Sequence, residues 1–171
     1  MRAGEVRAEG SGFRLQLVPG VCDGAEVRTI ARHRFGTYNM RMKIPRAPGS
    51  ISAFFLYADV RDGNDEIDIE LHNDTSRRAL LTTWVAGRKA HELTVRLDFD
   101  PAAAFHDYTI SWSRRELRFA ADGVPLAVLR DKIPTSPMKV VANVWWPVWT
   151  DCTPRSSPVA LEIESYILPD R

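Results

Sequence analysis

The sequence predicts an all-β domain, and three observations carry that prediction. Stretches in which apolar and polar residues alternate recur along the chain, as in strands with one buried face. Asp62-Gly63 and Asp122-Gly123 are dipeptides typical of tight hairpin turns. Helical periodicity is nearly absent, since Asp100–Ala104 can form one helical turn and no more. Many short strands with regular turns indicate a sandwich or jelly roll.

The expected strands differ in how strongly they are patterned. Phe13–Val18 and Gly36–Lys43 alternate, whereas Ile51–Tyr57 is a nearly continuous apolar run, typical of a strand covered on both faces. Glu66–His72 alternates strictly, and Ala121–Val124 is the turn of a hairpin. The expected strands are, in order, Phe13–Val18, Gly36–Lys43, Ile51–Tyr57, Glu66–His72, Leu80–Val85, His91–Phe99, Tyr108–Trp112, Leu117–Ala121, Ala127–Leu129, Lys139–Trp145 and Leu161–Leu168.

The length and composition fit one folded domain. The chain has 171 residues, about the size of one ordinary domain. Apolar residues make up 44% and charged residues 26%, so a packed core is available and disorder is not expected. No linker or repeat divides the chain, and the stretch Trp149–Pro158 is expected to be a surface loop. We therefore predict a single domain over residues 1–171.

Charge and cysteine content restrict the partners and the compartment. Lys and Arg number 23 and Asp and Glu 22, and a net charge of +1 predicts no binding to nucleic acid or to a membrane. Met1–Gly10 lacks the apolar stretch of a secretory signal, so the protein is cytoplasmic as written, or secreted if a leader has been removed. Cys22 and Cys152 allow one internal disulfide, but two reduced thiols are the slightly favoured interpretation.

The clearest chemical pattern lies in Gly63–His72. With the two-residue period of a strand, Ile67, Ile69 and Leu71 point to the core. The opposite face could be a solvated surface, but neighbouring like charges on a strand cost free energy, and a solvent face would normally mix charges of both signs. The polar side chains of that face are Asn64, Glu66, Asp68, Glu70 and His72, and Glu66, Asp68 and Glu70 are called the acid row below.

Two kinds of site fit the acid row. Carboxylates and His72 are ligands for a divalent cation, but positions i, i+2 and i+4 of a straight strand span about 13 Å and do not converge on one ion without a second strand. A retaining glycosidase needs two carboxyl groups about 5–5.5 Å apart, which Glu66 and Glu70 reach if a concave sheet bends the strand. Asp68 lies between them and can hold one of the two carboxyl groups in place through a hydrogen bond. The crowding of three acids also raises the pKa of at least one of them. Glycoside hydrolysis is therefore the preferred interpretation, and no metal ligand is assigned.

The segment Glu66-Ile67-Asp68-Ile69-Glu70 resembles the signature of glycoside hydrolase family 16. It has the unbulged form of the lichenase and xyloglucan endotransglycosylase branch. Further segments resemble family strands and turns in the same order over roughly residues 10–168, which is more specific than the signature alone. They are Ala25–Arg28, Phe35–Lys43, Phe105–Trp112, Asp122–Val124, Ile133–Lys139 and Asn143–Trp145.

The resemblance implies a β-jelly roll, a concanavalin A-like sandwich of two curved antiparallel sheets, slightly truncated at the N-terminus. It implies an endo-acting, retaining hydrolase of a β-linked glucan-type polysaccharide, with Glu66 as nucleophile, Asp68 as its helper and Glu70 as acid/base. No cofactor is expected; Glu164 falls near a structural calcium ligand of the family, but its partner ligands are not identifiable. The expected substrate-binding residues are Glu26, Arg28, Tyr57, Asn64, His72, Thr82, Trp84, Asn143, Trp145 and Trp149.

The sequence departs from the family pattern around the expected cleft. Asn64 stands where lichenases usually carry Trp, and Thr82 and Trp84 replace an Asn and Tyr pair. The stretch Trp145–Trp149 is unusually aromatic. We expect Trp145 in the cleft, Trp146 in the core and Trp149 in either place. His72 is either a polar residue at a strand end or a hydrogen-bond partner of the catalytic acid.

Three functions remain open from the sequence. A polysaccharide hydrolase is the first, with its glucan linkage and its balance between hydrolysis and transglycosylation undecided. A non-catalytic glycan-binding module is the second, because this fold also hosts lectin-like proteins. A scaffold reused for chemistry on a small apolar molecule inside the cell is the third. A missing first strand would expose a sheet edge, so the protein is expected to be a monomer or an edge-paired homodimer.

Overall fold

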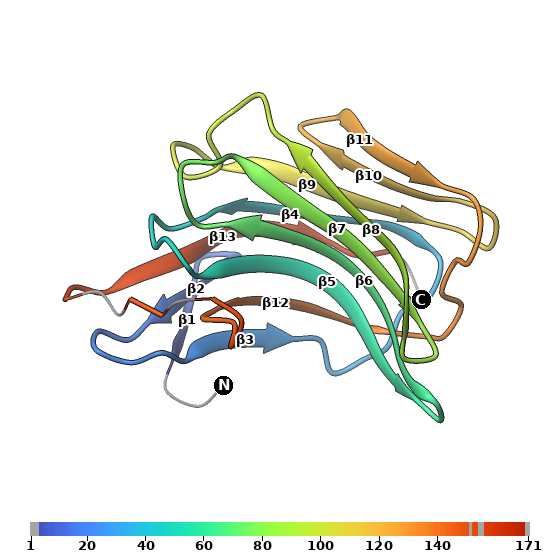
Figure 1. The fold of residues 1–171 in the computed structure, drawn as a ribbon, viewed down its shortest axis with the longest axis horizontal. Helices are drawn as coiled ribbons and strands as arrows, with labels where there is room; N and C mark the ends of the chain where they lie inside the picture. The colour runs from blue at the N-terminus through green and yellow to red at the C-terminus, as the bar shows by residue number, and fades with distance from the viewer. Residues whose placement is uncertain (1–3, 151, 154–155, 170–171) are drawn as a thin grey trace.

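The computed structural model describes residues 4–150, 152–153 and 156–169. These residues form thirteen strands and no helix, and so this part of the chain contains no helix that could cross a membrane. Figure 1 shows two sheets lying one over the other, with β5, β6 and β7 clearly curved. The strands are β1 (Glu5–Glu9), β2 (Gly12–Leu17), β3 (Gly24–Arg28), β4 (Gly36–Lys43), β5 (Ile51–Val60), β6 (Gly63–His72), β7 (Arg78–Val85), β8 (Arg88–Arg96), β9 (His106–Trp112), β10 (Leu117–Ala121), β11 (Val124–Leu129), β12 (Lys139–Trp145) and β13 (Val159–Ile167).

The predicted sandwich of two antiparallel sheets is confirmed. A seven-stranded sheet has the order β1-β2-β13-β4-β9-β10-β11, and a six-stranded sheet has the order β3-β12-β5-β6-β7-β8. Strand β6, which carries the acid row, lies between β5 and β7 and pairs with both. Because both of its edges are hydrogen-bonded, its register is fixed, and so is the face to which each of its side chains points.

One apolar core lies between the sheets. Ile67, Ile69 and Leu71 of β6 are fully buried in it, as their alternation predicted. Tyr38 and Met42 of β4, in the other sheet, belong to the same buried cluster. Successive side chains of a strand point to opposite faces, so the acid row lies on the outer face of the six-stranded sheet.

The strands that were predicted are all present, with ends shifted by up to three residues. Strands β1 and β3 were missed, because β1 is exposed throughout and has no alternation of burial, and β3 is short and begins with glycine. At Gly24 an added Cβ would lie 2.5 Å from the Cβ of Trp145, so only glycine allows β3 to approach β12 so closely. Asp100–Ala104 forms a turn, not a helix, closed by Ala103 N donating to Asp100 O at 3.0 Å.

The expectation of two reduced thiols is wrong, because Cys22 and Cys152 form a disulfide. Their Cα atoms lie 5.9 Å apart although 130 positions separate them in the sequence. The first cysteine precedes β3 and the second follows β12, and these two strands pair. The loop Trp149–Pro158 carries the second cysteine, and residues 151 and 154–155 of it lie outside the described residues.

Candidate active site

The start of β6 is held by Asp65. Its buried carboxylate accepts hydrogen bonds from the backbone N of Ala86 at 3.0 Å and from that of Ser136 at 3.2 Å. One donor lies in the turn between β7 and β8 and the other lies shortly before β12, so a single side chain ties three segments together. Gly63 begins the strand at φ 128°, and an added Cβ there would lie 2.5 Å from the Cα of Gly87.

A cleft of about 550 Å³ contains the acid row. Its walls come from β6, β7, β8 and the segment at the end of β12. This volume is in the range of small-molecule and oligosaccharide sites. The lining residues are Asn64, Glu66, Asp68, Glu70, Leu80, Thr82, Trp84, Lys89, Glu92, Trp145 and Trp149.

Hydrogen-bond donors surround the carboxylate of Glu66. Asn64 Nδ2 donates to its Oε2 at 2.6 Å, and Asp68 is a second hydrogen-bond partner. Burial raises the pKa of Glu66, while these two hydrogen bonds lower it again in part. Because both bonds stabilise the anion, Glu66 is the member of the acid row best suited to be ionised.

Asp68 is the most deeply placed of the three acids, with 5% of its surface exposed. Burial raises its pKa well above the usual value, and the neighbouring charges of Glu66 and Glu70 raise it further. The hydroxyl of Thr82 donates a hydrogen bond to its Oδ2. The protonated form of Asp68 is therefore favoured, and that form donates to Glu66.

Glu70 has the properties of a proton donor. Burial raises its pKa to about 7, and the charge of Glu66 contributes to this shift. Lys89 lowers the pKa of Glu70 and Glu92 raises it. A carboxyl group with a pKa near 7 holds a proton for a large part of the time at neutral pH, so it can protonate a leaving group.

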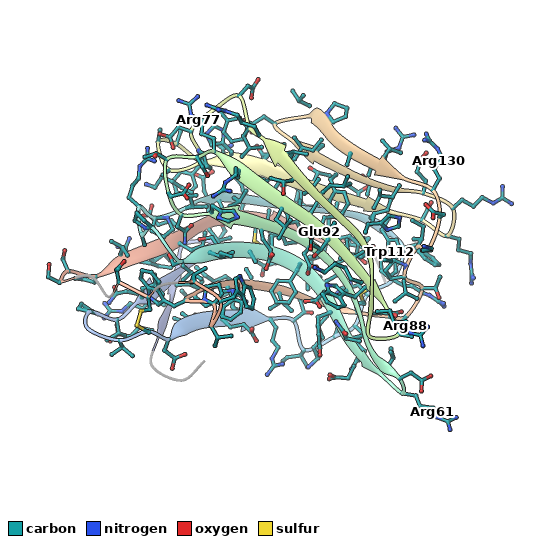
Figure 2. All side chains as sticks on the ribbon, viewed as in Figure 1. Arg61, Arg77, Arg88, Glu92, Trp112 and Arg130 are labelled. Carbon is teal, nitrogen blue, oxygen red and sulfur yellow. A yellow bond between two sulfur atoms is a disulfide. The ribbon has the colours of Figure 1, made fainter. Side chains whose placement is uncertain are left out.

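Lys89 and Glu92 belong to the cleft although no sequence pattern pointed to them. A β-bulge shifts the register after Thr83, so that Trp84 pairs with Lys89 and Ala90 is left over. The ammonium of Lys89 lies 5.4 Å from the ring centroid of Trp84 and pairs with Glu92. Glu92 lies midway along β8, the edge strand of the six-stranded sheet (Figure 2). A bulge leaves no mark in the residue spacing, which is why spacing missed Lys89.

Two aromatic residues form the wall opposite β8. Trp145 and Trp149 pack edge to face, with ring centroids 5.2 Å apart. Both line the cleft, as was expected for Trp145 and left open for Trp149. Trp146, between them in the sequence, is buried in the core.

Five of the expected binding residues do not line this cleft. Glu26 pairs with Asn143, which pairs with Ala53, which in turn pairs with Glu70. A row of residues therefore runs across the sheet from the edge strand to the acid row. Asn143 is buried, and its Oδ1 has no hydrogen-bond partner among the described residues.

Arg28 and Tyr57 do not line the cleft either, each for its own reason. Arg28 Nε is 3.8 Å from Glu26 Oε1, and its side chain borders a separate, mainly apolar cavity of about 120 Å³. Tyr57 is the cross-strand partner of Glu66, but its hydroxyl donates to Asp59 at 2.8 Å.

His72 is placed as a polar residue at the end of its strand. Burial lowers its pKa, and the charge of Arg78 lowers it further while that of Asp74 raises it. The groups that shift the pKa of Glu70 do not include His72. The geometry therefore favours the first of the two interpretations of His72.

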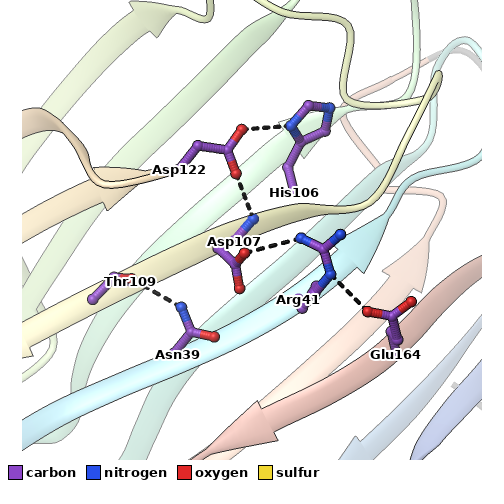
Figure 3. Close-up of polar contacts among 7 residues, drawn as sticks. All are labelled: Asn39, Arg41, His106, Asp107, Thr109, Asp122 and Glu164. Atoms are coloured by element: carbon purple, nitrogen blue, oxygen red, sulfur yellow. Dashed lines mark hydrogen bonds and ion pairs between the residues drawn. The ribbon is translucent and has the colours of Figure 1, made fainter.

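Glu164, which falls near a structural calcium ligand of the family, is paired with an arginine in this structure. Its Oε2 accepts a hydrogen bond of 2.6 Å from Arg41 Nε, and Arg41 Nη1 donates to Asp107 at 2.9 Å (Figure 3). The guanidinium of Arg41 thus links these two carboxylates. Within the part of the chain that is described, no group of three His, Cys, Asp or Glu side chains is arranged to hold a metal ion.

The family of the chain follows from comparison with known proteins. The family model of glycosyl hydrolases family 16 matches residues 2–156. The chain belongs to this family, which confirms the resemblance inferred from the sequence.

Individual relatives are bacterial and plant proteins. A beta-glucanase of Bacillus subtilis (strain 168) is 34% identical over 125 residues, which cover 72% of this chain and 52% of the relative. A xyloglucan endotransglucosylase/hydrolase of Brassica oleracea var. botrytis is 30% identical over 146 residues, which cover 78% of this chain and 49% of the relative. The chain spans about half the length of the curated relatives that it matches.

Solved structures share the fold over most of the chain. The beta-glucanase of Bacillus licheniformis has a TM-score of 0.80 and 27% identity, covering 91% of this chain and 76% of its own. A prokaryotic beta-1,3-1,4-glucanase (lichenase) derived from a mouse hindgut metagenome has a TM-score of 0.82 and 25% identity, with coverages of 94% and 80%.

Proposed function

We propose that this protein is an endo-acting, retaining glycoside hydrolase of a β-linked glucan-type polysaccharide. The observation that carries the proposal is the acid row, whose three carboxyl groups lie side by side in a cleft with their pKa values raised. Perturbed carboxyl groups in a cleft are typical of catalytic acids and nucleophiles. Relatives named beta-glucanase support the class of substrate.

The hydrogen bonds support a different role for each outer acid. Glu66, whose anion is stabilised by Asn64 and Asp68, attacks the anomeric carbon. Glu70, whose pKa is raised to about 7, protonates the leaving oxygen in the same step. A covalent glycosyl-enzyme forms, and Glu70 then takes a proton from the water that hydrolyses it.

Asp68 has a positioning role in this scheme. Its proton lies in the hydrogen bond to Glu66, and Thr82 fixes the other side of its carboxyl group. This arrangement orients the carboxylate of Glu66 toward the substrate. A neutral Asp68 also avoids a second negative charge beside that of the nucleophile, which would raise the cost of ionising Glu66.

The remaining cleft residues suit a sugar polymer. The rings of Trp84, Trp145 and Trp149 offer apolar surfaces on which the C–H faces of sugars stack. Beyond the cleft, Glu26 of β3 and Asn143 of β12 are cross-strand partners, so polar residues continue across the sheet toward its β3 edge. A surface that crosses several strands fits an extended chain.

The test is release of reducing sugar from a panel of β-glucans by the wild type and by Glu66→Gln. We expect activity on at least one polymer in the wild type, loss in the variant, and a β-anomer as the first product by NMR. Binding without turnover in the wild type would instead identify a glycan-binding module. No release and no binding with any polymer would refute the proposal.

A further inference from the structure

The turn after β12 carries the outermost wall of the cleft. Trp146 is 5% exposed and anchors the start of this turn in the core. Thr150 closes the turn, donating from its N and Oγ1 to the carbonyl of Pro147 at 3.1 and 2.9 Å. Between these points Val148 and Trp149 project outward, with exposures of 94% and 66%.

Trp149 is exposed and yet belongs to the cleft. Its ring packs edge to face on Trp145, and both rings line the cleft together with the acid row. A large aromatic side chain left in solvent marks a binding surface more than a folding contact. Val148 shares the turn but does not line the cleft, so it is a natural control.

The disulfide closes the far side of the turn. Cys152 lies three residues after Trp149 and is bonded to Cys22, which lies two residues before Gly24. Gly24 is the cross-strand partner of Trp145. The disulfide, the pairing of β3 with β12 and the turn therefore form a closed ring, and Trp149 is part of that ring.

We infer that the Cys22–Cys152 disulfide is a positioning element of the cleft, which holds the turn so that Trp149 stands against Trp145 and meets a sugar ring of the bound polysaccharide. The identity of this ligand rests on the proposed function. Breaking the bond weakens polysaccharide binding but leaves the chemistry intact, because β6 is held separately through Asp65. Such a link persists in an oxidising compartment, so the cleft is fully formed there.

The same bond also stabilises the fold, and the test must separate the two effects. It crosslinks positions 130 residues apart, which restricts the unfolded chain. A crosslink with only this role would lower Tm when removed and would leave KM of the folded protein unchanged. A crosslink that positions Trp149 changes KM at temperatures where the protein is fully folded.

The experiment compares four proteins and one control variant at a temperature where circular dichroism shows all of them folded. The four are the wild type, the double variant Cys22→Ala/Cys152→Ala, Trp149→Ala, and the three changes combined. We expect the double variant to raise KM on the hydrolysed glucan about tenfold, as loss of one aromatic contact does, with kcat within about twofold. Trp149→Ala should act similarly, and the combination should add nothing, because both changes remove the same contact. Val148→Ala should leave KM unchanged.

Two results would overturn the inference. One is an unchanged KM in the double cysteine variant with a lowered Tm, which would assign the disulfide to stability alone. The other is full additivity with Trp149→Ala. If the wild type hydrolyses no glucan, the same variants are compared by affinity electrophoresis in gels containing soluble β-glucan. Binding that depends on the disulfide supports the inference even then, and no binding by the wild type overturns it.

Discussion

Asn64 donates a hydrogen bond of 2.6 Å from its Nδ2 to Oε2 of Glu66, two positions further along the same strand. The strand geometry makes this contact possible, because residues i and i+2 point to the same face. Together with the bond from Asp68, it offsets part of the burial that raises the pKa of Glu66. The residue that departs from the lichenase pattern thus acts directly on the proposed nucleophile.

Asn64→Ala should therefore shift the acidic limb of the pH profile. Loss of the donor raises the pKa of Glu66, which must be ionised to attack, so the limb moves to higher pH. A hydrogen bond to a charged group contributes about 1.5–3 kcal/mol, so kcat/KM below the optimum should fall at least about tenfold. Asn39→Ala, which removes a surface contact to Thr109 on the other sheet, is the control and should leave the profile unchanged. An unshifted acidic limb in Asn64→Ala would contradict the assignment of Glu66.

The basic limb should report Glu70, whose pKa is raised to about 7. The proposed acid must be protonated, so kcat/KM should decline above this pH. Lys89 lowers the pKa of Glu70 and Glu92 raises it. Lys89→Met should therefore move the basic limb to higher pH and Glu92→Gln should move it to lower pH, with Lys132→Met in an exposed loop as the control. Shifts in the same direction for both cleft variants would show that another group sets this limb.

The fold was predictable where side-chain alternation reports burial. Strand β6 has buried Ile67, Ile69 and Leu71 on one side and the acid row on the other, so its position and its faces were visible in the sequence. Strand β1 packs neither face into the core, and β3 is held mainly by a close backbone approach at Gly24. Both segments alternate polar and apolar residues, but each has only two alternating apolar residues, which is too weak a signal to predict a strand.

The site was predictable along β6 but less so across the sheet. Residues on neighbouring strands reach the cleft through register, and register depends on a bulge in the case of Lys89. The disulfide was missed for a related reason: Cys22 and Cys152 are neighbours only because β3 pairs with β12. Residue spacing holds no information on either relation.

Asp65→Ala should destabilise the protein and slightly impair the cleft. The change leaves the backbone N–H groups of Ala86 and Ser136 without their acceptor, and a hydrogen bond to a carboxylate contributes about 1.5–3 kcal/mol. We expect the free energy of unfolding in urea to fall by about 2 kcal/mol or more. Asp62→Ala, in the exposed turn next to β6, is the control. Equal stability of the two variants would show that Asp65 does not tie these segments together.

Glu70→Gln should stabilise the protein at high pH while removing activity. The pKa of Glu70 is raised from the usual 4.5 to about 7 in the folded protein, so folding favours its protonated form. This contribution is fully present below pH 4.5 and is lost as the pH rises through 7, where the folded protein must hold a buried charge. At about 1.36 kcal/mol per pKa unit, and with some solvent access, the cost reaches up to about 3 kcal/mol.

Glutamine carries no charge at any pH, so the gain in Glu70→Gln should appear at pH 8 and vanish at pH 4. Urea unfolding at the two pH values measures it, and Glu9→Gln on the exposed strand β1 is the control, with little change at either. The comparison measures how much the buried charge of Glu70 lowers the stability of the folded protein. Such a cost is typical of a residue that is retained for its chemistry. A gain of the same size at both pH values would assign the effect to packing instead of to the buried charge.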